Sequence, residues 1–110
     1  MNTTIKLNQK FEIHDFFGDR YSAEILRKEI INIIEKGNAV TIDFEGVKGI
    51  GHSFADELFG LLVIHFGLNT IKEKLILTNG NSHIKTLTNL VVSDRVKKYG
   101  KHARASKKNI

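Results

Sequence analysis

The stretch VTIDFEGVKGIGHSFADELFGLL, residues 40–62, contains the change of hydrophobic period that decides the fold. Val40, Ile42 and Phe44 alternate with their neighbours, which predicts a strand over residues 39–44. Apolar residues then recur at helical spacing until Gly67, and the face they share holds Phe54, Leu58, Leu61, Leu62 and His65. The stretch therefore predicts a strand that leads through a short loop into a helix.

The alternation of strands and helices continues on both sides of this unit. Residues 18–38 carry a helical pattern that ends near Gly37, and a strand within 74–81 leads to a third helix over 82–96, with Ile84, Leu87 and Val91 facing inward. Near the start, TIKL (4–7) and KFEI (10–13) each alternate as half-buried strands do. Strands that alternate with helices predict an α/β fold with a largely parallel sheet, because crossover helices connect parallel neighbours.

Three glycines in and after the loop have different interpretations. Gly49 and Gly51 form a lone GxG, without the third glycine of a dinucleotide fingerprint and without a phosphate-binding loop, so they do not indicate a nucleotide site. We expect them to let the backbone turn tightly between strand and helix. Gly60 lies inside the helix, where glycine costs about 1 kcal/mol relative to alanine, and we expect a neighbouring strand to approach it closely.

Length and charge indicate one compact domain, residues 1–94, followed by a basic tail, residues 95–110. A chain of 110 residues with 41% hydrophobic residues is long enough to bury a core. The tail contains seven of the 17 Lys and Arg residues and no acidic residue, which leaves ten basic and twelve acidic residues in the rest of the chain. Because the tail has few apolar residues, we expect it to be flexible.

Composition excludes several classes of protein. The chain has no cysteine, which excludes disulfides, thiolate nucleophiles and cysteine-based metal sites. It shows neither a secretion signal at its start nor a run of 18 apolar residues, so we expect a cytoplasmic protein without a membrane partner.

Ser53 and Asp56 have the spacing of a capping box at the start of the second predicted helix. In that arrangement the serine hydroxyl accepts a hydrogen bond from a backbone amide of the first turn. The same position would also stabilise a phosphate on Ser53, since free amides and the positive end of the helix dipole lie close to it. Ser53 is therefore interpreted both as a cap and as a phosphoacceptor candidate.

The histidine and acidic residues of the same segment do not predict an active site. His52, Asp56 and Glu57 lack the HExxH spacing of a metalloprotease and offer a poor metal site. Ser53 is preceded by histidine and followed by phenylalanine, so the GxSxG elbow of a serine hydrolase is absent, although His83 could lie nearby. We expect no enzymatic activity, no metal and no cofactor.

The basic tail supports an alternative function. Positive charges bind nucleic acid mainly through its phosphates, and the affinity falls steeply with salt. The chain has no motif that reads DNA or RNA, and we favour a solvated or partner-facing tail. The residues assigned to the alternative, a nucleic-acid accessory protein, are Arg95, Lys97, Lys98, Lys101, Arg104, Lys107 and Lys108.

The segment at 40–62, followed by KLILTN (74–79) and a closing helix, resembles the bacterial STAS-like domain family of unknown function. That family is itself similar to the STAS domains of anti-sigma-factor antagonists. The resemblance covers about residues 20–93. It implies a small α/β sandwich in which a mostly parallel or mixed sheet of four or five strands is flanked by helices, with residues 39–60 as the working face.

The resemblance also implies a role in partner switching. In the antagonists this face binds a serine-kinase anti-sigma factor, and phosphorylation of a serine at the start of the helix breaks the complex. STAS-like proteins are often encoded beside a histidine-kinase-type ATPase, which implies a partner of that class here. An ungapped match puts Gly51 at the antagonists' aspartate and Ser53 one position from the usual acceptor.

We therefore predict a non-catalytic regulatory module that docks on a protein partner through residues 46–57 and the turn at 79–82. Asp56 and Glu57, taken as uncompensated carboxylates on the first helical turn, would suit a basic patch on that partner. The predicted partner-binding residues are Gly49, Gly51, His52, Ser53, Asp56, Glu57, Asn79 and Asn81.

Overall fold

The computed structural model describes residues 1–12 and 15–108, and from residue 99 on it describes the backbone alone. In chain order the elements are β1 (Asn2–Lys6), α1 (Leu7–Lys10), β2 (Phe16–Phe17), α2 (Arg20–Glu35), β3 (Ala39–Asp43), β4 (Gly49–Ile50), α3 (His52–Ala55), η1 (Asp56–Gly60), α4 (Leu61–Phe66), α5 (Leu68–Lys74), β5 (Leu75–Thr78) and α6 (Ser82–Lys108). The π-helical η1 joins α3 to α4 without a break, so residues 52–66 form one continuous helix.

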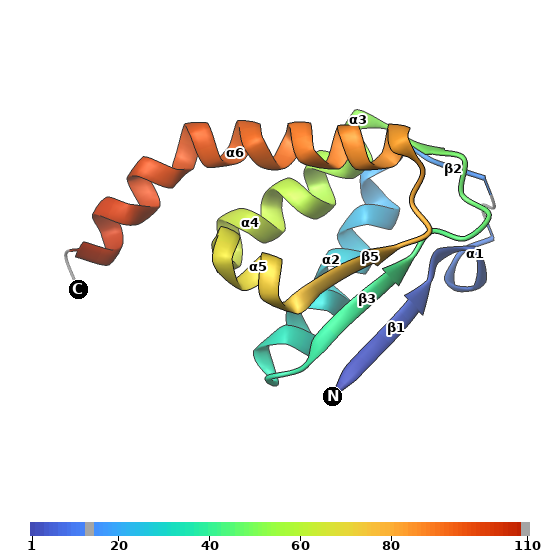
Figure 1. Ribbon diagram of the computed structural model, residues 1–110, viewed down its shortest axis with the longest axis horizontal. Helices are drawn as coiled ribbons and strands as arrows, with labels where there is room; N and C mark the ends of the chain where they lie inside the picture. Colours follow the sequence, from blue (N-terminus) through green and yellow to red (C-terminus); the bar gives the residue numbers. More distant parts are fainter. Residues whose placement is uncertain (13–14, 109–110) are drawn as a thin grey trace.

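Three parallel strands form the central sheet, in the order β1-β3-β5 (Figure 1). Strands β2 and β4 form a separate parallel pair, in which Phe16 lies opposite Gly49 and Phe17 opposite Ile50. The predicted α/β fold with a parallel sheet is confirmed, but the single sheet of four or five strands is wrong. After β1 the chain turns into α1, so the second strand pairs with β4 instead of lying in the central sheet.

Helix α2 and strand β3 follow directly from local sequence. Asp19 caps α2 by accepting a hydrogen bond from the Ser22 N–H at 2.8 Å. Gly37, with φ of +87°, follows the helix where a left-handed residue is needed. The buried face of α2 meets the alternating residues of β3 in the core, as the two periods predict; these buried residues are Leu26, Ile30, Ile34, Val40 and Ile42.

An ion pair and a histidine–carboxylate contact show how the helices are layered. Arg27 Nη2 lies 2.9 Å from Glu57 Oε2, and His65 Nε2 lies 3.4 Å from Glu35 Oε2. Both pairs join residues that are 30 positions apart, so α2 and the helix at 52–66 run parallel, side by side. Two right-handed crossovers in the same direction place both helices on one face of the sheet.

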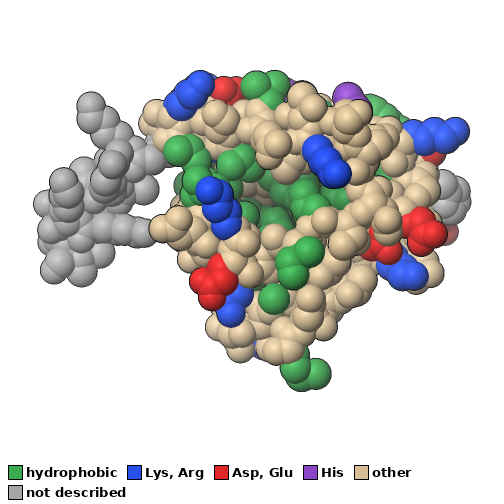
Figure 2. Space-filling model, in the orientation of Figure 1, with side chains coloured by type: hydrophobic (Ala, Val, Ile, Leu, Met, Phe, Trp, Pro, Cys, Tyr) green, Lys and Arg blue, Asp and Glu red, His purple; other side chains and the backbone are tan. Residues whose placement is uncertain are grey.

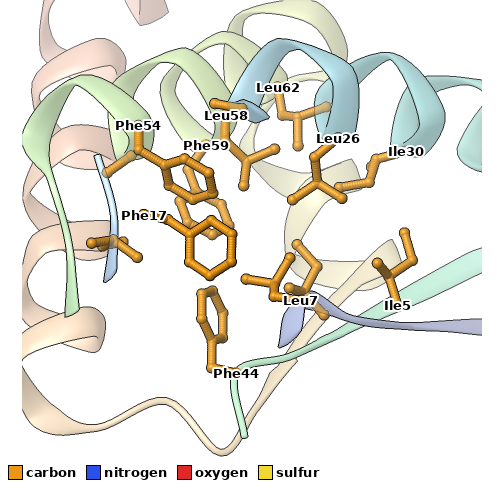
Figure 3. Close-up of a cluster of buried hydrophobic side chains, with 14 of the residues drawn as sticks. Ile5, Leu7, Phe17, Leu26, Ile30, Phe44, Phe54, Leu58, Phe59 and Leu62 are labelled. Carbon is orange, nitrogen blue, oxygen red and sulfur yellow. The ribbon is translucent and has the colours of Figure 1, made fainter. Parts of the chain in front are cut away.

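The core lies between that helical layer and the sheet. Figure 3 shows Phe17, Phe44, Phe54 and Phe59 among aliphatic side chains from the sheet and the helices, and all four rings are buried. The rings of Phe17 and Phe54 have centroids 5.6 Å apart, and those of Phe44 and Phe59 are 6.5 Å apart. Since aromatic contacts of this kind add to the gain from burial, they fix the start of the helix at 52–66 against both sheets.

Helix α6 lies along α3, η1 and α4, and its second half extends past them (Figure 1). Ile84 and Val91 are buried and Leu87 is half-buried, so the predicted inward face of this helix is confirmed. The helical backbone continues to Lys108, through most of the segment expected to be a tail. Flexibility of that segment stays a prediction.

Two local predictions near strands differ from the structure. The KFEI strand is wrong for Lys10–Glu12, because Lys10 ends α1 and Phe11 turns inward to pack against Phe17 with ring centroids 5.7 Å apart; Ile13 lies outside the described residues. Helix α5, which was not predicted, begins directly after Gly67 at φ of +88°. Its seven residues contain only two apolar ones, Leu68 and Ile71, which are too few to show a helical period.

Across the described residues, no single helix is long and apolar enough to cross a membrane. The helices His52–Phe66 and Leu68–Lys74 reach that length and composition only as a pair bent by 112°.

Candidate functional site

The loops that follow β3 and β5 meet at the carboxyl ends of the strands, where ligands commonly bind in parallel α/β sheets. The Asn81 side-chain amide donates to the Lys48 carbonyl at 2.7 Å, and His83 Nε2 lies 3.3 Å from the Ile50 carbonyl oxygen. The structure thus joins the predicted segment 46–57 to the turn at 79–82. We call the surface formed by residues 15–18, 45–53 and 79–83 the rim.

An aromatic ring that sequence analysis missed lies on the rim. Phe16, in β2, is 52% exposed, although phenylalanine is usually buried. Its ring lies against the backbone of three glycines: a Cβ on Gly18 would come within 2.9 Å of the ring, on Gly49 within 3.3 Å and on Gly51 within 3.7 Å. The glycines therefore form a platform that supports one face of the ring.

Gly49 and Gly51 have a different role from the one predicted. Gly49 is buried beneath Phe16 and contacts His83, whose Cδ2 would lie 3.4 Å from an added Cβ. Gly51 comes close to the Gly18 backbone, which leaves only 3.1 Å between an added Cβ and the Gly18 Cα. The two residues are therefore part of the platform on which the Phe16 ring lies.

The capping box at Ser53 is wrong. Gly51 occupies the N-cap position of α3 and provides no side-chain cap, and Ser53 is the second residue of the helix. Asp56, the other half of the predicted box, points to Arg95 on α6 instead. Ser53 is half-buried and His52 is exposed, so both remain at the surface of the first turn.

Asp56 is held by a bidentate ion pair. Arg95 donates from Nε at 2.8 Å and from Nη2 at 2.6 Å to the two carboxylate oxygens, with both side chains about four-fifths buried. Bidentate arginine-carboxylate pairs are strong and directional. The Arg95 hydrogen bond keeps the pKa of the Asp56 carboxyl below its ordinary value, although partial burial opposes the shift.

Glu57 is also compensated. Its two oxygens accept from Arg27 at 2.9 Å and from Arg20 at 3.2 Å, both on α2. The prediction of two uncompensated carboxylates is therefore wrong, because each one is paired with arginine from a neighbouring helix. Asp56 and Glu57 connect η1 to α6 and α2 and leave little free charge for a partner.

Gly60, the last residue of the π-helical turn η1, lies directly beside the pair of Asp56 and Arg95. A Cβ at Gly60 would lie 2.6 Å from Asp56 Oδ1 and 3.0 Å from Arg95 Cγ. The close neighbour of Gly60 is thus the Asp56 and Arg95 pair on two helices, and the expectation of a neighbouring strand is wrong. A π turn at such a place often marks a site of functional constraint.

Asn79 and Asn81 hold the loops of the rim in place through hydrogen bonds. Asn79 has a left-handed backbone, with φ of +59°, and its amide donates to Asp43 Oδ1 at 2.8 Å. This hydrogen bond is the main cause that lowers the pKa of the Asp43 carboxyl, assisted by the Glu45 N–H. Asn81 caps α6 by accepting from the Ile84 N–H at 2.9 Å. Both side chains are exposed but are used to hold the two loops together.

The described residues contain no group of three His, Asp or Glu side chains that could hold a metal ion. His52 lies near Asp56, whose pKa it helps to lower, but Asp56 is bound to Arg95. The arrangement leaves hydrogen-bonding groups and one aromatic ring exposed on the rim.

Of the seven residues assigned to nucleic-acid binding, Arg95 is engaged by Asp56. Lys97 and Lys98 are exposed on α6, while the side chains of Lys101, Arg104, Lys107 and Lys108 lie outside the described part. Figure 2 shows positive and negative side chains scattered over this view of the described surface, with hydrophobic side chains in a hollow between α6 and β5. Nucleic-acid binding through the tail stays a prediction.

The sequence contains one signal for the exposure of Phe16. Two adjacent phenylalanines in a strand point to opposite faces, so Phe16 and Phe17 cannot both face the core. The proximity of three glycines to the outward-facing ring becomes apparent only from the pairing of β2 with β4.

In a comparison with protein families, the model of the STAS-like domain of unknown function matches residues 22–85. The matched range contains Arg27, Asp56 and Glu57, whereas Phe16 and Arg95 lie outside it. No curated protein and no solved structure matches the chain.

Proposed function

The chain belongs to the family of STAS-like domains of unknown function, and from that premise we propose that it is a non-enzymatic regulatory module that docks on a protein partner through the rim. The observation that carries the proposal is Phe16. Its ring is 52% exposed on a platform of glycines, at the end of the sheet where loops from several strands converge. Large aromatic residues dominate the binding energy of protein interfaces when a partner covers them.

The neighbours of Phe16 suit recognition by a protein. His52 and His83 are exposed, and Lys48 and Glu45 are exposed on the loop beside them. These groups can form the polar border that surrounds a buried aromatic anchor in an interface. The loops are fixed by the hydrogen bonds of Asn79 and Asn81, so little conformational entropy is lost when a partner binds.

The class of partner follows from the resemblance of the sequence to partner-switching proteins. A histidine-kinase-type ATPase is the partner we propose, with Ser53 as its phosphoacceptor. Ser53 is half-buried in the first turn of α3, one turn before Asp56 and Glu57. A phosphate there would lie beside two carboxylates and compete for their arginines, which would disturb the rim by repulsion between like charges.

Docking is tested with the histidine-kinase-type ATPases encoded in the same genome, each purified and titrated with this protein by calorimetry. We expect one ATPase to bind, and Phe16→Ala to weaken that binding at least about tenfold, which corresponds to about 1.4 kcal/mol. Ile64→Ala is the matched control, because Ile64 is 41% exposed on α4, away from the rim. Equal binding by Phe16→Ala and wild type, or no binding to any ATPase, would contradict the proposal.

Phosphorylation has its own test. Incubation with the bound ATPase and ATP should add one phosphate to the intact protein, detected by mass spectrometry, and Ser53→Ala should remain unmodified. An unchanged mass for the wild-type protein would remove the phosphoacceptor role and leave docking in place.

A further inference from the structure

The outer edge of β1 is open. Strand β1 pairs with β3 on one side, and among the described residues no strand pairs with its other side. The Ala39 N–H donates to the Met1 carbonyl at 3.0 Å, so the backbone groups of Met1 face β3. Backbone groups alternate between the two edges of a strand, and those of Asn2, Thr4 and Lys6 therefore face the open edge.

An open groove of about 430 Å³ runs along this edge. Its lining comes from four consecutive β1 residues, from α1 and from α2, namely Thr3, Thr4, Ile5, Lys6, Gln9, Lys10 and Glu29. Lys10 and Glu29 form an ion pair with each other, so the wall of the groove has little net charge. Ile25, one turn before Glu29 on the same stripe of α2, is 38% exposed.

The edge also has little of the usual protection. Natural proteins protect open strand edges with proline, bulges, a covering element or charged side chains, lysine above all, and β1 reads NTTIK, with a single lysine at its end. That residue, Lys6, is attracted to Asp43 of the neighbouring strand, where it helps to lower the carboxyl pKa. An approaching strand therefore meets a single charged side chain on β1, at its end.

We propose that the occupant of this edge is β1 of a second copy of the chain, paired antiparallel about a two-fold axis at Thr4. In this register Thr4 lies opposite Thr4 of the second copy, and Asn2 opposite Lys6 of the second copy. All the residues brought opposite each other are those whose backbone groups face the open edge, so each pair can exchange two hydrogen bonds. Lys6 meets an uncharged asparagine at both ends, and threonine pairs across strands are favourable.

Two-fold pairing also joins the surfaces beside the strands. The groove wall of each copy is formed partly by α2, so the exposed Ile25 of both copies is brought toward the new interface. The two sheets become one sheet of six strands, with the carboxyl ends of the two copies at opposite ends. The dimer thus presents two rims that face away from each other.

The oligomeric state is measured by sedimentation equilibrium over a concentration series of wild type, Thr4→Pro and Thr4→Val. Proline at position 4 removes an N–H that faces the open edge and leaves the bonds to β3 intact, as edge strands tolerate. We expect dimers for wild type and Thr4→Val, and a dissociation constant at least tenfold higher for Thr4→Pro with an unchanged circular dichroism spectrum. A monomeric wild type, or a dimer that Thr4→Pro does not weaken, would overturn the proposal.

A second measurement is independent of the folding of the proline variant. The chain has no cysteine, so Thr4→Cys can form a disulfide only between copies. Directly opposite hydrogen-bonded residues of antiparallel strands have Cα atoms about 5.5 Å apart, within the range of a disulfide. We expect Thr4→Cys to crosslink on mild oxidation and the control Ile76→Cys, 41% exposed on β5, to remain monomeric. Crosslinking through Ile76→Cys alone would move the interface to β5 and exclude β1.

Discussion

Gly60 shows how one residue can be fixed by contacts far away in sequence. It lies in a helix, where replacing glycine by alanine normally increases stability by about 1 kcal/mol. Here a Cβ would lie 2.6 Å from the Asp56 carboxylate and 3.0 Å from the Arg95 side chain. Because Gly60 has no side chain, there is room beside it for the ion pair between η1 and α6.

We expect Gly60→Ala to lower the free energy of unfolding by about 1–3 kcal/mol, the usual cost of forcing extra volume into a packed site. Urea denaturation measures the change. The matched control introduces Gly60→Ala into an Asp56→Ala, Arg95→Ala background, where the obstruction is gone and alanine should be neutral or stabilising. A more stable Gly60→Ala in the wild-type background would show that the pair moves aside at no cost.

For single residues, the sequence predicted the backbone conformation better than the interaction partners of the side chains. Gly37 and Gly67 were correctly placed at helix ends, because the reversal of the backbone is a local requirement. The capping role of Ser53 and the free charges of Asp56 and Glu57 were predicted wrongly, and the two carboxylates are paired with arginines from other helices. No spacing along the chain contains that information.

At the scale of elements, carboxylates act as the connectors. Asp56 joins η1 to α6 through Arg95, Glu57 joins η1 to α2, and Asp43 joins β3 to the turn before α6 through Asn79. Asp43 and Asp56 each have a pKa below the ordinary carboxyl value, because hydrogen bonds favour the charged form. The carboxylates of η1 therefore tie it to two other helices, and the carboxylate of Asp43 ties β3 to the turn before α6.

This arrangement predicts a loss of stability in acid. A carboxyl whose pKa is lower in the folded state stabilises the fold above its unfolded pKa, near 4, and loses that contribution as the pH falls through the folded value. We expect the free energy of unfolding to fall as the pH drops below about 4 to 5. Asp56→Asn should be less stable than wild type at pH 7, and the difference should shrink toward pH 3.

Urea denaturation at several pH values measures this, with Glu73→Gln, an exposed carboxylate on α5, as the matched control. The control should follow the wild-type curve. A difference between Asp56→Asn and wild type that stays constant with pH would show that the carboxylate charge does not hold η1 to α6.

Long elements were predicted from period, and short ones were not. Helix α2, strand β3 and the helix at 52–66 bury enough residues for a period to be visible. Strands β2 and β4 have two residues each, too few to show any alternation, and their pairing depends on Phe17 reaching the core. The single sheet of four or five strands was implied by the family resemblance, and the structure has a three-stranded sheet and a separate two-stranded pair instead.

At the scale of the whole molecule, α6 joins the body to the basic segment. Arg95 was counted with the tail, yet it holds Asp56, and the half-buried Val96 packs against the core. The residues that stabilise the body thus extend at least to position 96. The positive charges beyond Val96 lie on the same helix. They can therefore be removed without removing the contacts that Arg95 and Val96 make with the body.

Two truncations separate these roles. A chain ending at residue 98 keeps Arg95 and Val96, and we expect its free energy of unfolding to match that of the full chain within about 0.5 kcal/mol, as for changes away from stabilising contacts. A chain ending at residue 94 leaves Asp56 partly buried without its arginine, which should cost about 1–3 kcal/mol. Full-length Arg95→Gln is the control that assigns the loss to the ion pair, since it should lose a similar amount. Equal stability of the two truncated chains would place the end of the folded body at residue 94 and show that the contact with Asp56 contributes nothing to it.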